Sequence, residues 1–204
     1  MKRSPVLVVT LVAAVVAAIA VGVFAVADRD SEWEMGPDMM TPRSTSTPGW
    51  WDDSWDSMHG ASPSSEPEYL VEMVAHHEEA VAAARELTRS DRAQMRAFGA
   101  SIVRTQSAQI EQMTIWLANW YPDHSTAAHY RPMMRDLTGL SGDRLDRAFL
   151  QDMVGHHMVA VMMSQHRLWQ GTEHREVAAL ARLIRDDQHA EIIQMQRWLD
   201  RWFG

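Results

Sequence analysis

The sequence predicts an all-α protein whose main domain is a four-helix bundle made of two tandem helical hairpins. Three observations indicate this fold. Apolar residues recur at spacings of three and four over long segments, as they do in amphipathic helices. A His-His motif occurs at His76-His77 and again at His156-His157, 80 positions later, and a Gln-x-x-(Glu/Gln) motif follows each copy. The connections are short within each half and long between the halves, which is typical of a duplicated hairpin.

The composition of the 204-residue chain limits the functions that it can have. Cysteine is absent, which excludes disulfides, thiolate metal sites and cysteine nucleophiles. The 15 methionines and 10 histidines leave thioether sulfur and imidazole nitrogen as the candidate metal ligands. A net charge of -8, with arginines scattered along the helices, is the opposite of what nucleic-acid backbones attract. We therefore expect no nucleic-acid partner.

Residues 1–27 predict a transmembrane anchor or an export signal. Lys2 and Arg3 precede an uncharged apolar run that is long enough to cross a bilayer. The basic pair would stay in the cytoplasm, so the rest of the chain would lie outside it. The Ala-Val-Ala triplet that ends at Ala27 also fits a signal-peptidase site. The chain is thus expected to be a single-pass cell-membrane protein with an extracytoplasmic domain or, if cleaved after Ala27, a secreted or periplasmic protein. The length of the run favours the anchor.

Residues 28–67 are expected to form a flexible tether. The segment is rich in Ser, Thr, Pro, Gly and Asp and has no helical or strand period. It also carries Met35, Met39, Met40, Met58 and His59, together with four tryptophans. Two interpretations are open. The tether is a disordered stalk whose tryptophans rest on the domain or the membrane, or it is a mobile collector of soft metal ions.

Start and stop signals divide residues 68–204 into four predicted helices. Ser65 and Glu68 form a capping-box signature at the start of the first helix. The expected helices run over residues 68–88, from a cap at Ser90 or Asp91 to residue 120, over residues 143–169, and from a cap at Thr172 to residue 202. Residues 121–142 form the long connection between the two halves.

Polar residues interrupt the apolar seams of the second and fourth predicted helices. Gln106 and Gln109 lie on the core-facing stripe of the second, and Gln188 and Glu191 on that of the fourth. A buried carboxylate without a partner is costly, so Glu191 must face a cation or a hydrogen-bond donor. We expect each His-His segment to meet a Gln-x-x-(Glu/Gln) segment, either within its own half or across the duplication.

The repeated histidines are interpreted as a metal site. A single histidine on an apolar helix face is usually a hydrogen-bonded core residue, but here the pair recurs with a methionine on the same face. Thioether sulfur selects Cu(I) and Ag(I), whereas imidazole also suits Cu(II), Zn and Fe. A carboxylate-bridged di-iron centre needs Glu-x-x-His motifs, which this sequence lacks. The candidate ligands are Met73, His76, His77, Met153, His156, His157, Met158, Met162 and Met163.

Residues 68–204 resemble the DUF305 family of ferritin-like four-helix bundles. The second half matches the family pattern at Phe149, Met153, His156, His157, Ala160, Met163, Gln188, Glu191, Ile192, Met195 and Trp198. The first half departs from it, because Tyr69, Ala83 and Gln109 stand where the pattern has Phe, Met and Glu. The resemblance implies an exported protein that binds copper or silver and aids metal tolerance.

The leading hypothesis is an extracytoplasmic protein that sequesters or transfers Cu(I), with Ag(I) as the alternative ion, without turnover. His156, His157, Met153 and Met163 would form the main site, helped by Met158 and Met162. Met73, His76 and His77 would form a weaker site or complete a shared one, and the Gln and Glu residues would orient the imidazoles. Since only neutral imidazole binds metal, affinity should fall below about pH 6.5. The alternatives are a metal-free, membrane-tethered structural or interaction bundle and a metal-dependent oxidoreductase.

Overall fold

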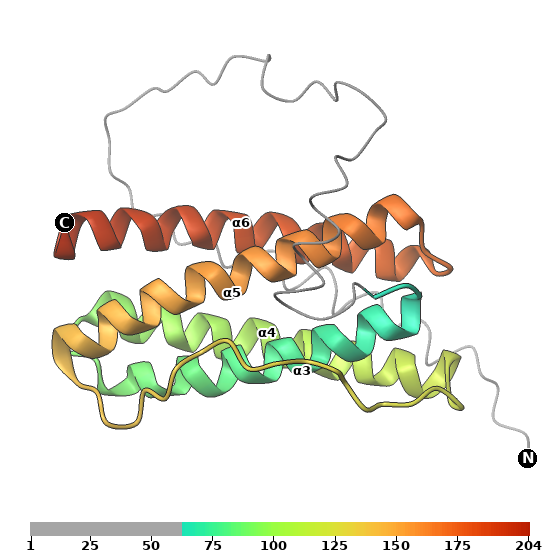
Figure 1. The fold of residues 1–204 in the computed structure, drawn as a ribbon, viewed down its shortest axis with the longest axis horizontal. Helices are drawn as coiled ribbons and strands as arrows, with labels where there is room; N and C mark the ends of the chain where they lie inside the picture. Colours follow the sequence, from blue (N-terminus) through green and yellow to red (C-terminus); the bar gives the residue numbers. More distant parts are fainter. Residues whose placement is uncertain (1–62) are drawn as a thin grey trace, which may run out of the picture. The chain divides into compact units, whose positions relative to one another are not determined.

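The computed structural model describes residues 63–204, which form an all-α domain of four long helices (Figure 1). The helical segments are α3 (Glu66–Glu86), the short 3-10 helix η2 (Leu87–Arg89), α4 (Ala93–Trp120), α5 (Gly142–Gln170) and α6 (Arg175–Phe203). The helices α3 and α4 pack as one pair and α5 and α6 as the other, while α3 and α5 join the two pairs. The predicted four-helix domain of two helix pairs is therefore confirmed.

The predicted anchor at residues 1–27, and nearly all of the tether at 28–67, lie outside the described residues. None of the helices within residues 63–204 has both the length and the apolar character that crossing a membrane requires.

The capping box predicted at the start of the first helix is confirmed. The Ser65 hydroxyl accepts a hydrogen bond from the backbone N–H of Glu68, and the Glu68 carboxylate accepts one from the backbone N–H of Ser65, both at 3.3 Å. The helix begins at Glu66 rather than at Glu68, because Pro67 is well suited to the first turn, where no backbone N–H is needed.

The two other predicted caps are wrong. Helix α4 begins after Arg92 rather than after Ser90 or Asp91, and α6 begins after His174 rather than after Thr172. Neither N-cap side chain bonds the first turn of its helix. Both side chains instead contact other parts of the fold: Arg92 donates to the carboxylates of Asp143 and Asp146, and His174 bonds Glu66. Contacts between distant segments, rather than local capping, therefore set these two starts.

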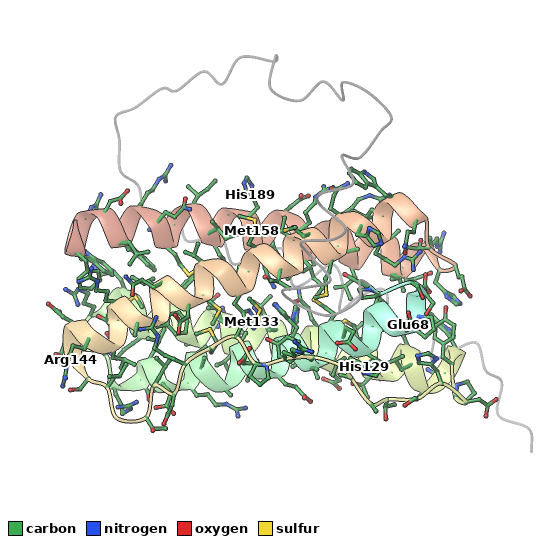
Figure 2. All side chains as sticks on the ribbon, in the orientation of Figure 1. Glu68, His129, Met133, Arg144, Met158 and His189 are labelled. Carbon is green, nitrogen blue, oxygen red and sulfur yellow. The ribbon has the colours of Figure 1, made fainter. Side chains whose placement is uncertain are left out.

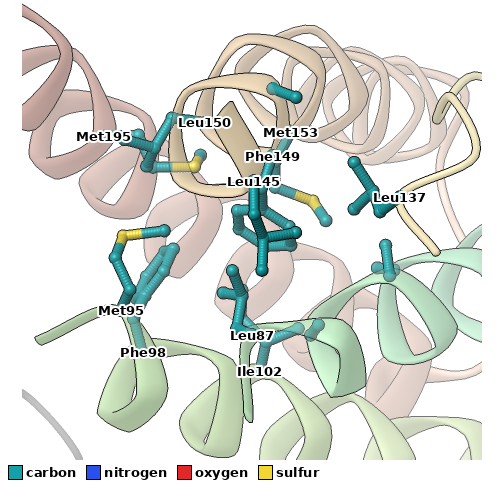
Figure 3. Packing of buried hydrophobic residues seen from close by; sticks show 14 of the residues in the cluster. Leu87, Met95, Phe98, Ile102, Leu137, Leu145, Phe149, Leu150, Met153 and Met195 are labelled. Atoms are coloured by element: carbon teal, nitrogen blue, oxygen red, sulfur yellow. The ribbon is translucent and has the colours of Figure 1, made fainter. Parts of the chain in front are cut away.

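Two apolar clusters form the core. The first contains Tyr69, Leu70, Val71, Met73, Met113, Trp116, Leu117, Val159, Ala160, Met163, Val177, Leu180, Ala181 and Ile184. The second, part of which is shown in Figure 3, contains Ala80, Ala83, Ala84, Leu87, Met95, Phe98, Ile102, Leu137, Leu145, Ala148, Phe149, Leu150, Met153, Ile192 and Met195.

The composition of the clusters shows how α3 and α5 cross. The first cluster combines the first half of α3 with the second half of α5, and the second cluster combines the opposite halves. The two helices therefore run antiparallel, and their midpoints meet between the clusters. Both His-His doublets lie at these midpoints, so the duplication brings them together at the centre of the domain.

The long connection between the halves, residues 121–141, has no regular helix and runs along α3 (Figure 1); we call it the connecting strap. Its side chains close the outer side of the core. Leu137 belongs to the second apolar cluster, Met133 packs against the first, and Met134 packs against the second. The strap therefore spans both clusters at the level where the doublets lie.

Candidate metal centre

A layer of polar residues crosses the middle of the bundle and separates the two apolar clusters. It consists of His76, His77, Gln106, Gln109, His156, His157, Gln188 and Glu191, which we call the polar layer. All four imidazoles are completely buried, and the three glutamines are nearly so. Glu191 is partly buried, with 26% of its side chain exposed. Each of the four helices contributes two residues, as the periodicity of the sequence predicts.

The two equivalent histidines of the duplication face each other at the crossing of α3 and α5. The ring centroids of His76 and His156 are 3.7 Å apart. Within each doublet the rings are further apart, at 6.0 Å for His76 and His77 and 6.1 Å for His156 and His157. The four imidazoles thus form one continuous group rather than two separate pairs.

Hydrogen bonds fix the tautomer of three of these histidines. The Nε2 atom of His76 lies 3.0 Å from the backbone oxygen of His156, and that of His77 lies 2.8 Å from Oε1 of Gln109. The Nε2 atom of His157 lies 2.7 Å from a carboxylate oxygen of Glu191. Carbonyl and carboxylate oxygens only accept, so Nε2 carries the proton in each ring. The Nδ1 atom of each ring therefore carries no proton and has a lone pair available.

These lone pairs have no partner. Within residues 63–204, the Nδ1 atoms of all four layer histidines are buried and accept no hydrogen bond. A buried polar atom without a partner costs free energy. Four such atoms would not be expected in a core whose only role is to stabilise the fold. A histidine that binds a metal usually donates its other N–H to a carbonyl or carboxylate. The bonding of these rings therefore fits metal ligands that use Nδ1.

Nitrogen and oxygen donors alone do not complete a site in this arrangement. Among the described residues, no three His, Asp or Glu side chains already surround one point in a way that could hold a metal ion. Thioether sulfur, the other candidate donor in this chain, favours soft ions such as Cu(I) over hard cations.

The structure places most of the predicted methionines in or against the two apolar clusters and leaves one exposed. Met73 and Met163 are buried in the first apolar cluster, and Met153 is buried in the second. Met162 is half-buried against the first cluster. Met158 lies on the outer side of α5 with 42% of its surface exposed, so it does not face the buried histidines (Figure 2).

The expected contact between each His-His doublet and a Gln-x-x-(Glu/Gln) segment occurs within each half. Gln109 bonds His77 in the first half, and Glu191 bonds His157 in the second. The alternative pairing across the duplication does not occur among these hydrogen bonds. Gln106 and Gln188 lie in the layer, but their side-chain amides have no hydrogen-bond partner within the described residues.

Burial favours the neutral form of three layer histidines, His76, His77 and His156. Desolvation, together with the neighbouring imidazoles, lowers the pKa of His76 well below its usual range. Desolvation likewise lowers the pKa of His77 to about 3, and its bond to Gln109 opposes this effect. Burial also lowers the pKa of His156, and the nearby carboxylate of Glu79 partly offsets the effect. These three rings would therefore take up a proton only at a lower pH than the value of about 6.5 that is usual for an exposed histidine.

Sequence reasoning missed Glu79 and Tyr130. A carboxylate oxygen of Glu79 lies 3.3 Å from Nε2 of His156. The same carboxylate accepts hydrogen bonds from the hydroxyl of Tyr130 and from the backbone N–H groups of Met133 and Met134. The ring of Tyr130 packs edge-on against His76, with 5.6 Å between centroids. Glu79 follows the first doublet at helical spacing, which is a usable signal, whereas no periodicity marks Tyr130 in the strap.

Fold and site together define a class: four-helix bundles of duplicated hairpins with a buried histidine layer at the crossing of the two halves. The chain belongs to the DUF305 family, described as a domain of unknown function, whose sequence profile matches residues 66–199. The resemblance noted in the sequence is thereby confirmed. Comparison with curated protein sequences gives no significant match.

Several solved structures are similar to this chain. The Cu(I)-bound form of CopM is 28% identical, with a TM-score of 0.61, and the match covers 69% of this chain and 99% of that one. CopM has also been solved with Ag and with Cu(II) bound. A DUF305 protein of Streptomyces coelicolor, described as a candidate secreted protein, is 25% identical with a TM-score of 0.60, over 66% of this chain and 89% of that one. A DUF305 fragment from Deinococcus radiodurans is 29% identical with a TM-score of 0.59, over 68% and 99%.

Proposed function

We propose that this protein binds Cu(I), and also Ag(I), outside the cytoplasm, and that it sequesters the ion or passes it on without catalytic turnover. The observation that carries the proposal is the state of the buried imidazoles. Three of them hold their proton at Nε2 and present a bare Nδ1, with thioethers in the clusters on both sides of the layer. The copper and silver forms of CopM, at 28% and 29% identity, support the same ligand class.

The donors fall into two groups around the crossing of α3 and α5. His156 and His157, with Met153 and Met163, form the main group in the second half. His76, His77 and Met73 form the group of the first half, and the close approach of His76 to His156 makes one shared site the simpler arrangement. Met162 is a further thioether, packed against the first cluster, and the exposed Met158 is the least suited of the predicted ligands.

The neighbouring polar residues set which nitrogen is free. Glu191 and Gln109 accept the Nε2 protons of His157 and His77, so each ring is held with Nδ1 bare. Such partners orient the ligand and raise its basicity. The layer supplies no residue that resembles a nucleophile activated by a base, and for this reason we propose binding rather than catalysis.

The N-terminal sequence and one member of the family support the proposed location. The apolar run of residues 1–27 is an anchor or an export signal in either interpretation, so the ferritin-like domain would face the outside. The description of the Streptomyces coelicolor protein agrees with export of DUF305 domains. An extracytoplasmic site would meet copper before it enters the cytoplasm.

The direct test is a competition titration of full-length protein with Cu(I) against a coloured chelator. The variant His156→Ala/His157→Ala is expected to lose at least about 100-fold in affinity, because even partners that only orient a ligand contribute about 10- to 100-fold. The matched control is His129→Ala/His189→Ala, which removes two exposed imidazoles. Equal affinity in the two double variants would contradict the proposed site. A wild-type protein that binds no Cu(I) would favour the metal-free structural bundle.

A further inference from the structure

The first half carries a carboxylate that the duplication does not repeat. Glu79 of α3 corresponds to Val159 of α5, 80 positions later. Val159 is buried in the first apolar cluster, as a core position should be. The Glu79 side chain is also largely buried, with 15% exposed, yet it carries a charge next to the polar layer. Burying a charged group at such a position costs free energy, so its presence indicates a specific role there.

The hydrogen bonds of Glu79 connect the strap to the layer. Its carboxylate accepts from the backbone N–H groups of Met133, at 2.9 Å, and Met134, at 3.0 Å, and from the hydroxyl of Tyr130. These three donors, with the imidazole of His156 at 3.3 Å, favour the charged form of the carboxylate. The carboxylate is therefore an anion that holds the strap at the level of the histidines.

His156 differs from the other three layer histidines in its hydrogen bonding. Within residues 63–204, neither of its ring nitrogens makes a hydrogen bond, although the ring is completely buried. Its Nε2 atom is 3.3 Å from the Glu79 carboxylate without the geometry of a hydrogen bond. His76, the equivalent residue of the first half, uses its Nε2 to bond the backbone of His156. The two halves therefore differ at the point that faces the strap.

The strap segment that Glu79 binds carries two thioethers, those of Met133 and Met134. Met133 packs against the first apolar cluster and Met134 against the second, so the two side chains lie on either side of the edge of the polar layer. Both are half-buried, unlike the fully buried Met73 and Met153. Figure 2 labels Met133 on the strap midway along the bundle. These sulfurs are therefore nearer to solvent than the other thioethers of the core.

We propose that His156, Met133 and Met134 form an outer site for a soft monovalent cation, Cu(I) or Ag(I), with Glu79 as its counter-charge. This site receives the ion from solvent before the ion reaches the inner histidines, and the proposal rests on the proposed function. Thioether and imidazole donors select soft ions. A single negative charge balances a single positive one, which removes the main cost of bringing a cation into a buried layer.

The first experiment follows the methionine methyl groups. Full-length protein labelled with ¹³C at the methionine methyls is titrated with Ag(I), which avoids oxidation, and Met133→Leu and Met134→Leu assign the two signals. Both signals are expected to shift during the first equivalent of Ag(I), while that of Met195, deep in the second cluster, stays in place. Leucine keeps the volume of methionine, so these variants preserve the packing. Unshifted Met133 and Met134 signals in a protein that binds Ag(I) would overturn the outer site.

The second experiment measures affinity by chelator competition. Met133→Leu/Met134→Leu and Glu79→Gln are each expected to weaken Ag(I) and Cu(I) binding by about 10-fold or more. The matched controls are Met95→Leu/Met195→Leu, two core thioethers away from the layer, and Glu78→Gln, the exposed neighbour with the same charge. Equal losses in Glu78→Gln and Glu79→Gln would mean that general surface charge, not the proposed counter-charge, acts on the ion.

The outcomes separate the outer site from the proposed function. We call Met133→Leu/Met134→Leu and Glu79→Gln the strap variants. If His156→Ala/His157→Ala loses binding while the strap variants keep wild-type affinity, the outer site is overturned and the proposed function stands. Absence of Ag(I) and Cu(I) binding in the wild-type protein overturns both. Loss of affinity in the strap variants but not in their controls supports both.

Discussion

The proton positions on the layer histidines follow from their acceptors rather than from the histidines themselves. An imidazole in water exchanges between two tautomers, but a carboxylate at 2.7 Å from Nε2 of His157 stabilises only one of them. The bare Nδ1 is the consequence. The acceptor on the opposite helix therefore determines whether each histidine offers a lone pair, and a change there should alter metal binding without removing any ligand.

Substituting Glu191 tests this dependence. In Glu191→Leu the Nε2 proton of His157 loses its acceptor, the tautomer is no longer fixed, and Cu(I) affinity is expected to fall by about 10- to 100-fold. Glu191→Gln keeps an acceptor oxygen at the same position and should stay closer to wild type. Competition titrations at pH 7 measure both. If Glu191→Leu binds Cu(I) as tightly as Glu191→Gln does, the acceptor has no part in binding.

The stability of the metal-free protein is expected to fall as the pH drops below about 6.5. In the unfolded chain, His76, His77 and His156 take up protons near that pH. In the folded protein burial lowers all three pKa values, to about 3 for His77, so the unfolded state binds more protons. The free energy of unfolding therefore falls as the pH drops from about 6.5 toward the pKa that each group has in the folded protein. The slope is about 1.4 kcal/mol per pH unit for each group.

Urea unfolding between pH 7 and pH 5, in the presence of a chelator, measures this slope. His77→Gln removes one of the three groups and should make the slope shallower by about 1.4 kcal/mol per pH unit. A free energy of unfolding that does not change between pH 7 and pH 5 would show that these imidazoles are not buried in the neutral form.

At the level of the helices, the close approach of α3 and α4 depends on one glycine. A Cβ atom on Gly99 would lie 2.7 Å from the backbone oxygen of Ala84 and 2.9 Å from Cβ of Leu87. These contacts are too short for a real side chain, and one of the atoms belongs to the backbone, which cannot move away cheaply. Gly99 thus allows the first hairpin to close at its turn.

A pair of glycine substitutions tests this reading. Gly99→Ala is expected to lower the free energy of unfolding by about 1–3 kcal/mol through overpacking. Gly155→Ala, also within a helix, meets nothing within 4 Å and should raise it by about 0.5–1 kcal/mol, because alanine restricts the unfolded chain more than glycine does. Denaturant unfolding of the metal-free protein measures both, and changes of the same sign would contradict the assigned packing.

The strap explains how two nearly equivalent hairpins acquire different surroundings. Only one connection joins the halves, and it runs along α3. Its contacts end on carboxylates of α3 and α5: the backbone N–H of His129 donates to Glu72, and the Arg135 side chain pairs with Asp152. The duplicated sequence therefore produces a pseudo-symmetric core with an asymmetric cover.

Across the domain, a buried carboxylate joins three chain segments at one end of the bundle. Glu66, at the start of α3, is 1% exposed. It accepts hydrogen bonds from the hydroxyl of Tyr121 at 2.9 Å and from the backbone N–H of Glu173 at 2.7 Å. The imidazole of His174 lies 2.7 Å from it and stacks on Trp120. This cluster links the first hairpin to the turn of the second, so it should stabilise the assembled domain.

Glu66→Ala is expected to lower the free energy of unfolding by about 2–4 kcal/mol, because it removes a buried carboxylate and leaves several partly buried donors unpaired. Glu78→Ala, which removes an exposed carboxylate from the same helix, should change it by no more than about 0.5 kcal/mol. Denaturant unfolding at pH 7 gives both values. A Glu66→Ala variant as stable as Glu78→Ala would show that the cluster does not hold the hairpins together.

The helices and their inward faces could be predicted because both depend on local spacing. The capping box at Ser65, the ends near Trp120 and Gly171, and the polar interruptions at Gln109 and Glu191 all follow from residues within a turn or two. The starts of α4 and α6 could not be predicted in this way. They depend on contacts of Arg92 and His174 with distant segments, which no local signal records.

The duplicated doublets, the absence of cysteine and the polar positions in otherwise apolar seams already specified a four-helix domain with imidazole and thioether donors at its centre. Folding alone decided that His76 and His156 meet, that Glu79 and the strap close one side, and that Met158 stays outside. The physical reason is range. Helical periodicity acts over a few residues, whereas the antiparallel crossing of α3 and α5 and the course of the strap depend on how separate segments pack together.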